Sequence, residues 1–223
     1  MSKKFMVLAL AAVSAAMFAL PAVASAGEWE NTTKSPFTVS NEGATPIVLT
    51  ASNGDTVTCT GVSGAGTWST NKHGTIPKGL DFTGCSAFGF SCSTSGSPAG
   101  TITTNALTFT TVYLNSGKTT PGITLKPNSG ETFVSFNCFI LPVTVHGSIN
   151  GHIETGCTDS ANVPLEFAST GTHGSVKWPY NTGNSAEPFD DLRVTKSGST
   201  FTGSMDATGT VNFGGVTQDI HCV

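Results

Sequence analysis

The chain has 223 residues, a formal net charge of −4, and only 11% charged residues. A nucleic-acid-binding face needs clustered Lys and Arg, so this balance argues against nucleic acid as a partner. Long surface helices also need many charged residues, whereas 26 glycines and 14 phenylalanines favour strands and turns. The composition therefore indicates an all-β protein.

The first 26 residues have the pattern of a secretory signal peptide. Lys3 and Lys4 supply the positive start, residues 5–20 are an apolar run, and Ala24-Ser25-Ala26 is a small-residue cleavage site. We therefore predict that the chain is exported and that residues 27–223 form a single secreted β domain.

The predicted mature chain lacks a membrane anchor. Loss of the two signal-peptide lysines lowers its formal charge to about −6. Gly27 stands where a lipoprotein would carry a cysteine, and the first cysteine is Cys59. No later apolar run approaches the roughly 18 residues of a membrane span. We expect a secreted protein, not a lipoprotein, without membrane insertion of the mature chain.

Apolar and polar residues alternate in many short runs after the signal. Val57 and Cys59 share one face of the first clear run, and Val134, Phe136 and Cys138 share one face of a later one. Turn signals such as Asn53-Gly54 and Ser197-Gly198 separate such runs. The predicted fold is a disulfide-stapled antiparallel β-sandwich or jelly roll, with a flattened β-barrel as the runner-up. The predicted strands are 36–41, 45–50, 56–60, 79–84, 101–104, 107–114, 121–126, 132–138, 143–149, 163–168, 191–195, 199–203, 208–213 and 216–221.

Asn150-Gly151 is a strong local signal for a hairpin turn. A two-residue loop there would place His152 beside Ile149 and Ile153 beside Ser148, which mixes the apolar and polar faces. The register around this dipeptide therefore stays open at the level of sequence.

Six cysteines follow the signal, and in an exported chain an even number indicates three disulfides. Six cysteines allow fifteen pairings, and spacing does not choose among them. Cys85 and Cys92 are close enough to close a local loop, while Cys59 and Cys138 both lie on apolar strand faces. The set that we expect is Cys85–Cys92, Cys59–Cys138 and, by subtraction, Cys157–Cys222.

Several segments carry a family resemblance. They are Gly79-Leu-Asp-Phe-Thr-Gly-Cys85, Phe88-Gly-Phe-Ser-Cys92, Gly100-Thr-Ile-Thr-Thr-Asn-Ala-Leu107, Leu125-Lys-Pro-Asn-Ser-Gly130, Phe133-Val-Ser-Phe-Asn-Cys138 and Val143-Thr-Val-His-Gly-Ser148. With the signal, these parts of residues 55–155 resemble a family of uncharacterised secreted β proteins of soil actinobacteria. The resemblance implies an exported β fold in which Cys59, Cys85, Cys92 and Cys138 recur. It implies no catalytic residue, because no activity is established for the family.

Motifs for catalysis or metal binding are weak. Gly61-Val-Ser-Gly-Ala65 lacks the last glycine of a nucleophile elbow, and no helix is predicted after it. The five histidines lack zinc-ligand spacing, and the carboxylates are scattered, with the densest group at Glu187-Pro-Phe-Asp-Asp191. We therefore expect no enzyme activity, no cofactor and no metal.

One aromatic segment is a candidate ligand-binding site. Trp178 and Tyr180 lie in a predicted loop, where they can stack on a sugar ring while Asn181 hydrogen-bonds its hydroxyls; the alternative is that the two rings cover the end of the core. The primary expectation is a non-catalytic secreted or cell-surface protein with a structural or interaction role, whose partners are cell-wall glycan or other surface proteins. A carbohydrate-binding module that uses this segment is the second, and an extracellular polysaccharide hydrolase is the third.

Overall fold

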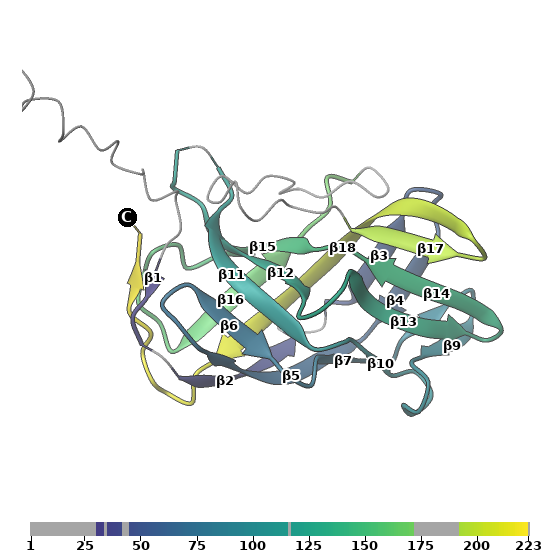
Figure 1. Ribbon diagram of the computed structural model, residues 1–223, viewed down its shortest axis with the longest axis horizontal. Helices are drawn as coiled ribbons and strands as arrows, with labels where there is room; N and C mark the ends of the chain where they lie inside the picture. Colours follow the sequence, from purple (N-terminus) through teal and green to yellow (C-terminus); the bar gives the residue numbers. More distant parts are fainter. Residues whose placement is uncertain (1–29, 34, 42–44, 116, 172–191, 223) are drawn as a thin grey trace, which may run out of the picture.

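A computed structural model describes residues 30–222 except 34, 42–44, 116 and 172–191, and Figure 1 shows these residues as strands and connecting loops. The predicted all-β class is confirmed. Within these ranges no helix is long and apolar enough to cross a membrane. The predicted signal, residues 1–26, lies outside the described residues and stays a prediction.

The strands are short except for β18. In chain order they are β1 (Glu30–Asn31), β2 (Pro36–Asn41), β3 (Ile47–Ala51), β4 (Thr56–Cys59), β5 (Gly61–Trp68), β6 (His73–Ile76), β7 (Leu80–Thr83), β8 (Ser86–Ala87), β9 (Phe90–Ser93), β10 (Ile102–Thr103), β11 (Leu107–Tyr113), β12 (Pro121–Pro127), β13 (Thr132–Cys138), β14 (Leu141–His146), β15 (Ile149–Ile153), β16 (Asn162–Phe167), β17 (Arg193–Lys196), β18 (Ser199–Asn212) and β19 (Ile220–His221).

Eight antiparallel strands close into a ring, which we call the first ring. Its order is β2-β5-β6-β11-β12-β15-β16-β18, and β18 pairs again with β2. The longest ladder joins β11 and β12 from Leu107 opposite Pro127 to Tyr113 opposite Pro121. A closed ring of strands is a feature of β-barrels, the runner-up in the fold prediction.

The strand pairings contain a second closed circuit, which we call the second ring. It runs β18-β3-β4-β8-β9-β13-β14-β17 and returns to β18. The two rings share β18: residues 199–206 pair with β17 and β3, and residues 207–212 pair with β16 and β2. One long strand therefore forms a wall of both rings.

Four aromatic rings fill the inside of the first ring. The Phe109 ring lies 5.7 Å from the Phe37 ring and 4.8 Å from Trp68, both edge to face, and Phe213 lies 5.8 Å from Phe37. All four side chains are buried. Aromatic pairs in this arrangement contribute about 0.5–1.5 kcal/mol each beyond the area that they bury.

Glycines in the surrounding strands make room for these rings. A Cβ at Gly66 would overlap the Phe37 ring, and a Cβ at Gly74 would overlap the Phe109 ring. A strand glycine marks a place where another group approaches the backbone closely. The glycine-rich β5, which the strand prediction omitted, is therefore a packed wall of the first ring.

Three other expectations differ from the structure. Asn150-Gly151 lies inside β15, and the chain reverses earlier, between Cys138 and Leu141, because β13 pairs with β14 and β12 pairs with β15. The strands expected at 199–203 and 208–213 are one continuous strand, β18. The strand expected at 216–221 is reduced to β19, because Val216 is held in a turn by its N–H bond to the Phe213 carbonyl, 3.2 Å.

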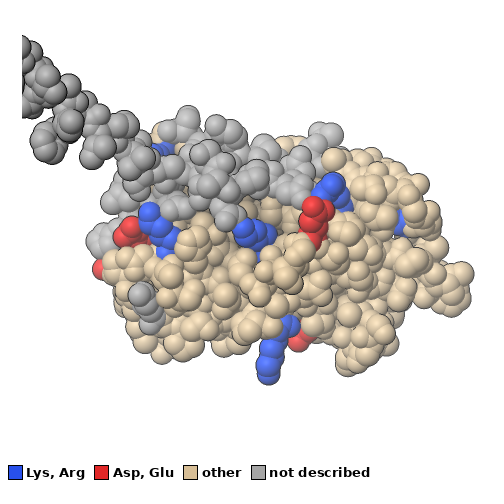
Figure 2. Space-filling model, in the orientation of Figure 1, with Lys and Arg blue, Asp and Glu red and all other residues tan. Residues whose placement is uncertain are grey.

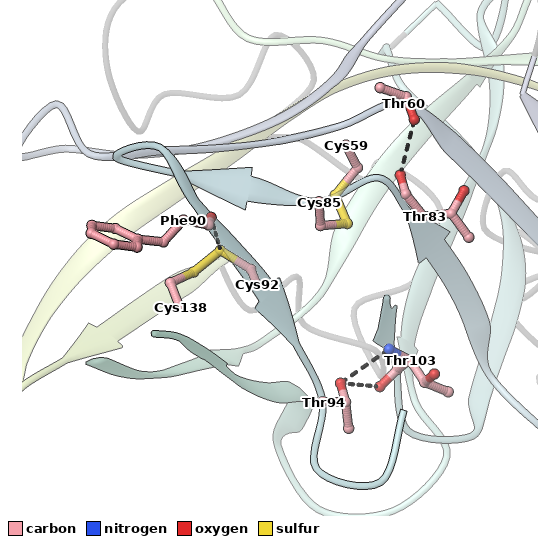
Figure 3. Close-up of a disulfide and its surroundings, with 9 residues drawn as sticks. All are labelled: Cys59, Thr60, Thr83, Cys85, Phe90, Cys92, Thr94, Thr103 and Cys138. Atoms are coloured by element: carbon pink, nitrogen blue, oxygen red, sulfur yellow. Dashed lines mark hydrogen bonds between the residues drawn. A yellow bond between two sulfur atoms is a disulfide. The ribbon is translucent and has the colours of Figure 1, made fainter. Parts of the chain in front are cut away.

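All six cysteines form disulfides, as predicted, and the pairs are Cys59–Cys85, Cys92–Cys138 and Cys157–Cys222. The third pair agrees with the expectation, and the other two correct it. Cys85 and Cys92 face each other across the β8–β9 hairpin, where the Cys92 N–H donates to the Cys85 carbonyl at 2.9 Å, yet each is bonded to the strand on its other side (Figure 3).

Strand order explains the correction. Cys59 lies in β4 and Cys138 in β13, and the β8–β9 hairpin separates these two strands. Three strand spacings amount to about 14 Å, twice the roughly 7 Å between Cα atoms that a disulfide can bridge. The expected Cys59–Cys138 bond therefore cannot form in this fold.

Candidate interaction site

The exposed large apolar side chains gather at one end of the molecule. In the described part of the chain, four of the five lie in or directly beside two neighbouring turns, and Val216 is the fifth. We call the four the aromatic tip: Phe88 (60% exposed), Phe90 (50%), Phe139 (67%) and Ile140 (74%).

The first of the two turns joins β8 to β9. Ala87 pairs with Phe90, so the loop consists of Phe88 and Gly89, and both have positive φ, +53° and +80°. A two-residue hairpin loop with positive φ at both positions favours Asn-Gly or Asp-Gly. A left-handed conformation costs a non-glycine residue about 1–2 kcal/mol. The fold thus holds a phenylalanine where a polar residue would be more stable.

The second turn joins β13 to β14 and has the same property. Cys138 pairs with Leu141, which leaves Phe139 and Ile140 as the loop, and Phe139 has φ +57°. Glycine is the usual residue at a hairpin loop position with positive φ. A second aromatic side chain is therefore displayed at a conformational cost.

Contacts between side chains fix the two turns to each other. The rings of Phe90 and Phe139 stack with centroids 4.9 Å apart and planes 20° apart. On the other side of the hairpin, the Lys196 ammonium at the end of β17 lies 4.8 Å from the Phe88 ring centroid. Stacking and cation–π contacts both hold the rings in defined positions.

Lys196 is itself held by Asp55. Its Nζ donates to the Asp55 carboxylate at 2.6 Å, and the Asn53 amide donates to the same oxygen at 2.8 Å. The hydrogen bond from Lys196 keeps the pKa of Asp55 below its ordinary value, against the opposite effect of burial. The carboxylate therefore neutralises the cation beside the aromatic tip.

Two disulfides lie directly behind the aromatic tip. The backbone ladders here are short: β4 and β8 share one residue pair, Thr58 with Ser86, and β9 and β13 share two. Cys59–Cys85 crosses the first of these seams and Cys92–Cys138 the second. Covalent bonds thus hold the turns where hydrogen bonding between strands is weakest.

The sequence-predicted binding residues are not part of this site. Trp178, Tyr180 and Asn181 lie outside the described residues, so the carbohydrate-binding prediction that rests on them stays a prediction. The signal that sequence reasoning missed is the apolar character of two hairpin loops, Phe88-Gly89 and Phe139-Ile140. Loop positions of this kind usually carry Gly, Asn, Asp or Ser.

The described carboxylates are spread over the surface in structural contacts. Arg193 lies 3.3 Å from Glu131, His152 lies 3.8 Å from Glu166, and Asp81 accepts a hydrogen bond from Thr103 at 2.7 Å. Within the described ranges, no three His, Cys, Asp or Glu side chains are grouped so that they could hold a metal ion. Each of these three carboxylates thus contacts a side chain on a strand elsewhere in the chain.

Small voids lie between the described core side chains. One of them, inside the first ring between Phe37, Trp68 and Phe109, is apolar and measures about 70 Å³. Pockets for small molecules usually measure about 300–1,000 Å³. The void is therefore a packing defect of the core rather than a ligand site.

No family model, curated protein or solved structure matches this chain. Among the described residues, the aromatic tip is therefore the feature that bears most directly on function.

Proposed function

We propose that the protein is an exported, non-catalytic interaction protein that attaches to the cell envelope through the aromatic tip. The observation that carries this proposal is the display of four exposed apolar side chains at two neighbouring turns, in which Phe88 and Phe139 adopt positive φ. Exposed apolar clusters on folded proteins mark interaction sites. A strained backbone at an exposed site supports the same interpretation.

Export is part of the proposal and has separate support. Three disulfides fit an oxidising compartment outside the cytosol, and residues 1–26 read as the signal that would direct the chain there. In such a compartment the two disulfides behind the aromatic tip persist and keep its turns rigid. A rigid site loses little conformational entropy when it binds.

The test compares two variants of the full chain in cells that export it. The tip variant, Phe139→Asn with Ile140→Thr, makes the second turn polar. The control, Val216→Thr, changes the exposed apolar residue that lies in a different turn. We expect the wild type and the control in the envelope fraction and the tip variant in the medium. Equal distribution of all three, with unchanged circular dichroism, would contradict the proposal, as would a wild type found wholly in the medium.

A further inference from the structure

We infer that the target of the aromatic tip is the interfacial region of a lipid bilayer, into which the two turns insert their side chains. This inference rests on the proposed function and names the surface that is bound. It departs from the expectation that the mature chain does not insert into membranes. The insertion is shallow, because it uses two hairpin turns rather than a spanning segment.

The shape of the site favours a bilayer over a pocket in another molecule. The turn between β13 and β14 lies at the end of the molecule opposite β1 (Figure 1). The β8–β9 turn lies beside it, because the Phe90 and Phe139 rings are stacked. They project as two adjacent hairpin ends. Projecting aromatic and aliphatic side chains can enter the boundary between headgroups and acyl chains without any matching cavity.

The size of the site argues against a second copy of this chain as the main occupant. An aromatic side chain contributes about 150–250 Å² of surface. With half to three quarters of each side chain exposed, the aromatic tip offers roughly 450 Å². A stable protein interface buries about 800 Å² on each partner. Insertion into a bilayer sets no such requirement for a complementary surface.

The charge around the site fits an apolar contact. Figure 2 shows the end that carries the β13–β14 turn almost without red or blue. Beside the aromatic tip, Lys196 and Asp55 form an ion pair, so their charges cancel locally. The chain as a whole is acidic. Attraction to anionic lipid therefore contributes little, and we expect binding to neutral phosphatidylcholine that persists at high salt.

The experiment is co-sedimentation of the disulfide-bonded protein with phosphatidylcholine vesicles in 0.1 M and about 1 M salt. We expect the wild type and Val216→Thr to sediment with the vesicles in both. We expect the tip variant to bind at least about tenfold more weakly, because each apolar side chain kept in water loses its transfer energy. A wild type that does not bind, or a tip variant that binds equally, overturns the inference.

A fluorescent variant reports insertion directly. Phe139→Trp keeps an aromatic ring at the tip. We expect the emission that it adds to that of the three wild-type tryptophans to shift to the blue and to be quenched by lipids brominated on their acyl chains, while wild-type emission changes less. Lack of quenching despite binding overturns insertion. Sedimentation velocity tests for self-association. If the wild type self-associates, the tip variant does not, and neither binds vesicles, the inference of a bilayer target is overturned and a second copy of the chain is the partner.

The outcomes separate this inference from the proposed function. If retention on the envelope depends on the tip but the protein does not bind vesicles, the inference of a bilayer target is overturned. Attachment to another envelope component is then supported. Failure of the tip variant to change either retention or vesicle binding overturns both.

Discussion

The two rings are stabilised in different ways. The first ring contains the longest backbone ladder, between β11 and β12, and is filled by packed aromatic rings, and its β1–β19 side carries a buried hydrogen bond of 3.0 Å from Asn31 to Gln218. The second ring has short ladders around β8 and β9, two disulfides across them, and the aromatic tip on its turns. The β1–β19 end thus has aromatic packing and one disulfide, Cys157–Cys222, whereas two disulfides lie behind the aromatic tip at the other end.

The difference shows how exposed apolar side chains can be held without collapsing inward. The turns of the aromatic tip add little to the core, so hydrophobic burial does not stabilise them. A disulfide acts chiefly on the unfolded chain and needs no buried area. Cross-links therefore suit a segment whose apolar residues must stay in contact with solvent.

Loss of a disulfide behind the aromatic tip should have the largest effect. Replacing Cys92 and Cys138 by Ala removes a bond that closes 46 residues, so we expect the free energy of unfolding to fall by about 4 kcal/mol. Denaturant titration measures this loss, and hydrogen exchange should show early loss of protection in β8 and β9. Early loss of hydrogen-exchange protection in β11 and β12 instead would contradict the statement that the two rings are stabilised in different ways.

A methyl group inside the first ring should have the next largest effect. Gly66→Ala places a Cβ against Phe37, and such overpacking costs about 1–3 kcal/mol. The control is Gly117→Ala, whose Cβ would meet no atom closer than 3.9 Å. Thermal denaturation should separate the two variants. Equal melting temperatures would mean that the glycines of the first ring are not packing positions.

Polar residues in the turns of the aromatic tip should not destabilise the fold. Phe88→Asn creates an Asn-Gly loop suited to two positive φ values, so relief of the strained backbone offsets the lost cation–π contact. We expect the free energy of unfolding to stay equal or to rise by up to about 1 kcal/mol, while binding to vesicles weakens. Denaturant titration of both proteins tests this, and a loss above about 1 kcal/mol would show that Phe88 supports the fold.

The ion pair beside the aromatic tip should have the smallest effect. The pKa of Asp55 is lowered in the folded protein, so its contribution to stability is present above the unfolded pKa of about 3.9 and is lost as the pH falls through the lower folded pKa. For a partly exposed pair we expect less than about 1 kcal/mol. The stability of Asp55→Asn should therefore fall less than that of the wild type between pH 5 and pH 2. If the free energies of unfolding of the two proteins change with pH in parallel, groups other than Asp55 cause the loss of stability in acid.

Local sequence patterns identified the β class and many strands. Alternation is visible at β4 and β13, because one face of each strand packs on the core. It is absent from β5, where the aromatic ring of Phe37 occupies the space in front of Gly66 and no apolar side chain of β5 is needed there. Turn propensity failed at Asn150-Gly151, because β15 is paired on both sides and tertiary pairing overrode the local preference.

The disulfides and the site depend on neighbours that are distant in the sequence. Cys85 and Cys92 satisfied a local argument, but β4 and β13 lie beside their hairpin, and nothing local shows this order. The sequence predicts the site at Trp178, because aromatic residues in a polar loop are the familiar signal. Nothing local in the sequence shows that Phe88 and Phe139 lie in exposed turns that are neighbours in space.

Strand β18 has a thermodynamic consequence. Its 14 residues run without interruption from one ring into the other, so neither ring can be cut out of the chain and keep all its walls. Loss of strand pairing in either half of β18 therefore weakens a strand that both rings need. The molecule should therefore melt cooperatively, as a single calorimetric event, despite its two unlike ends.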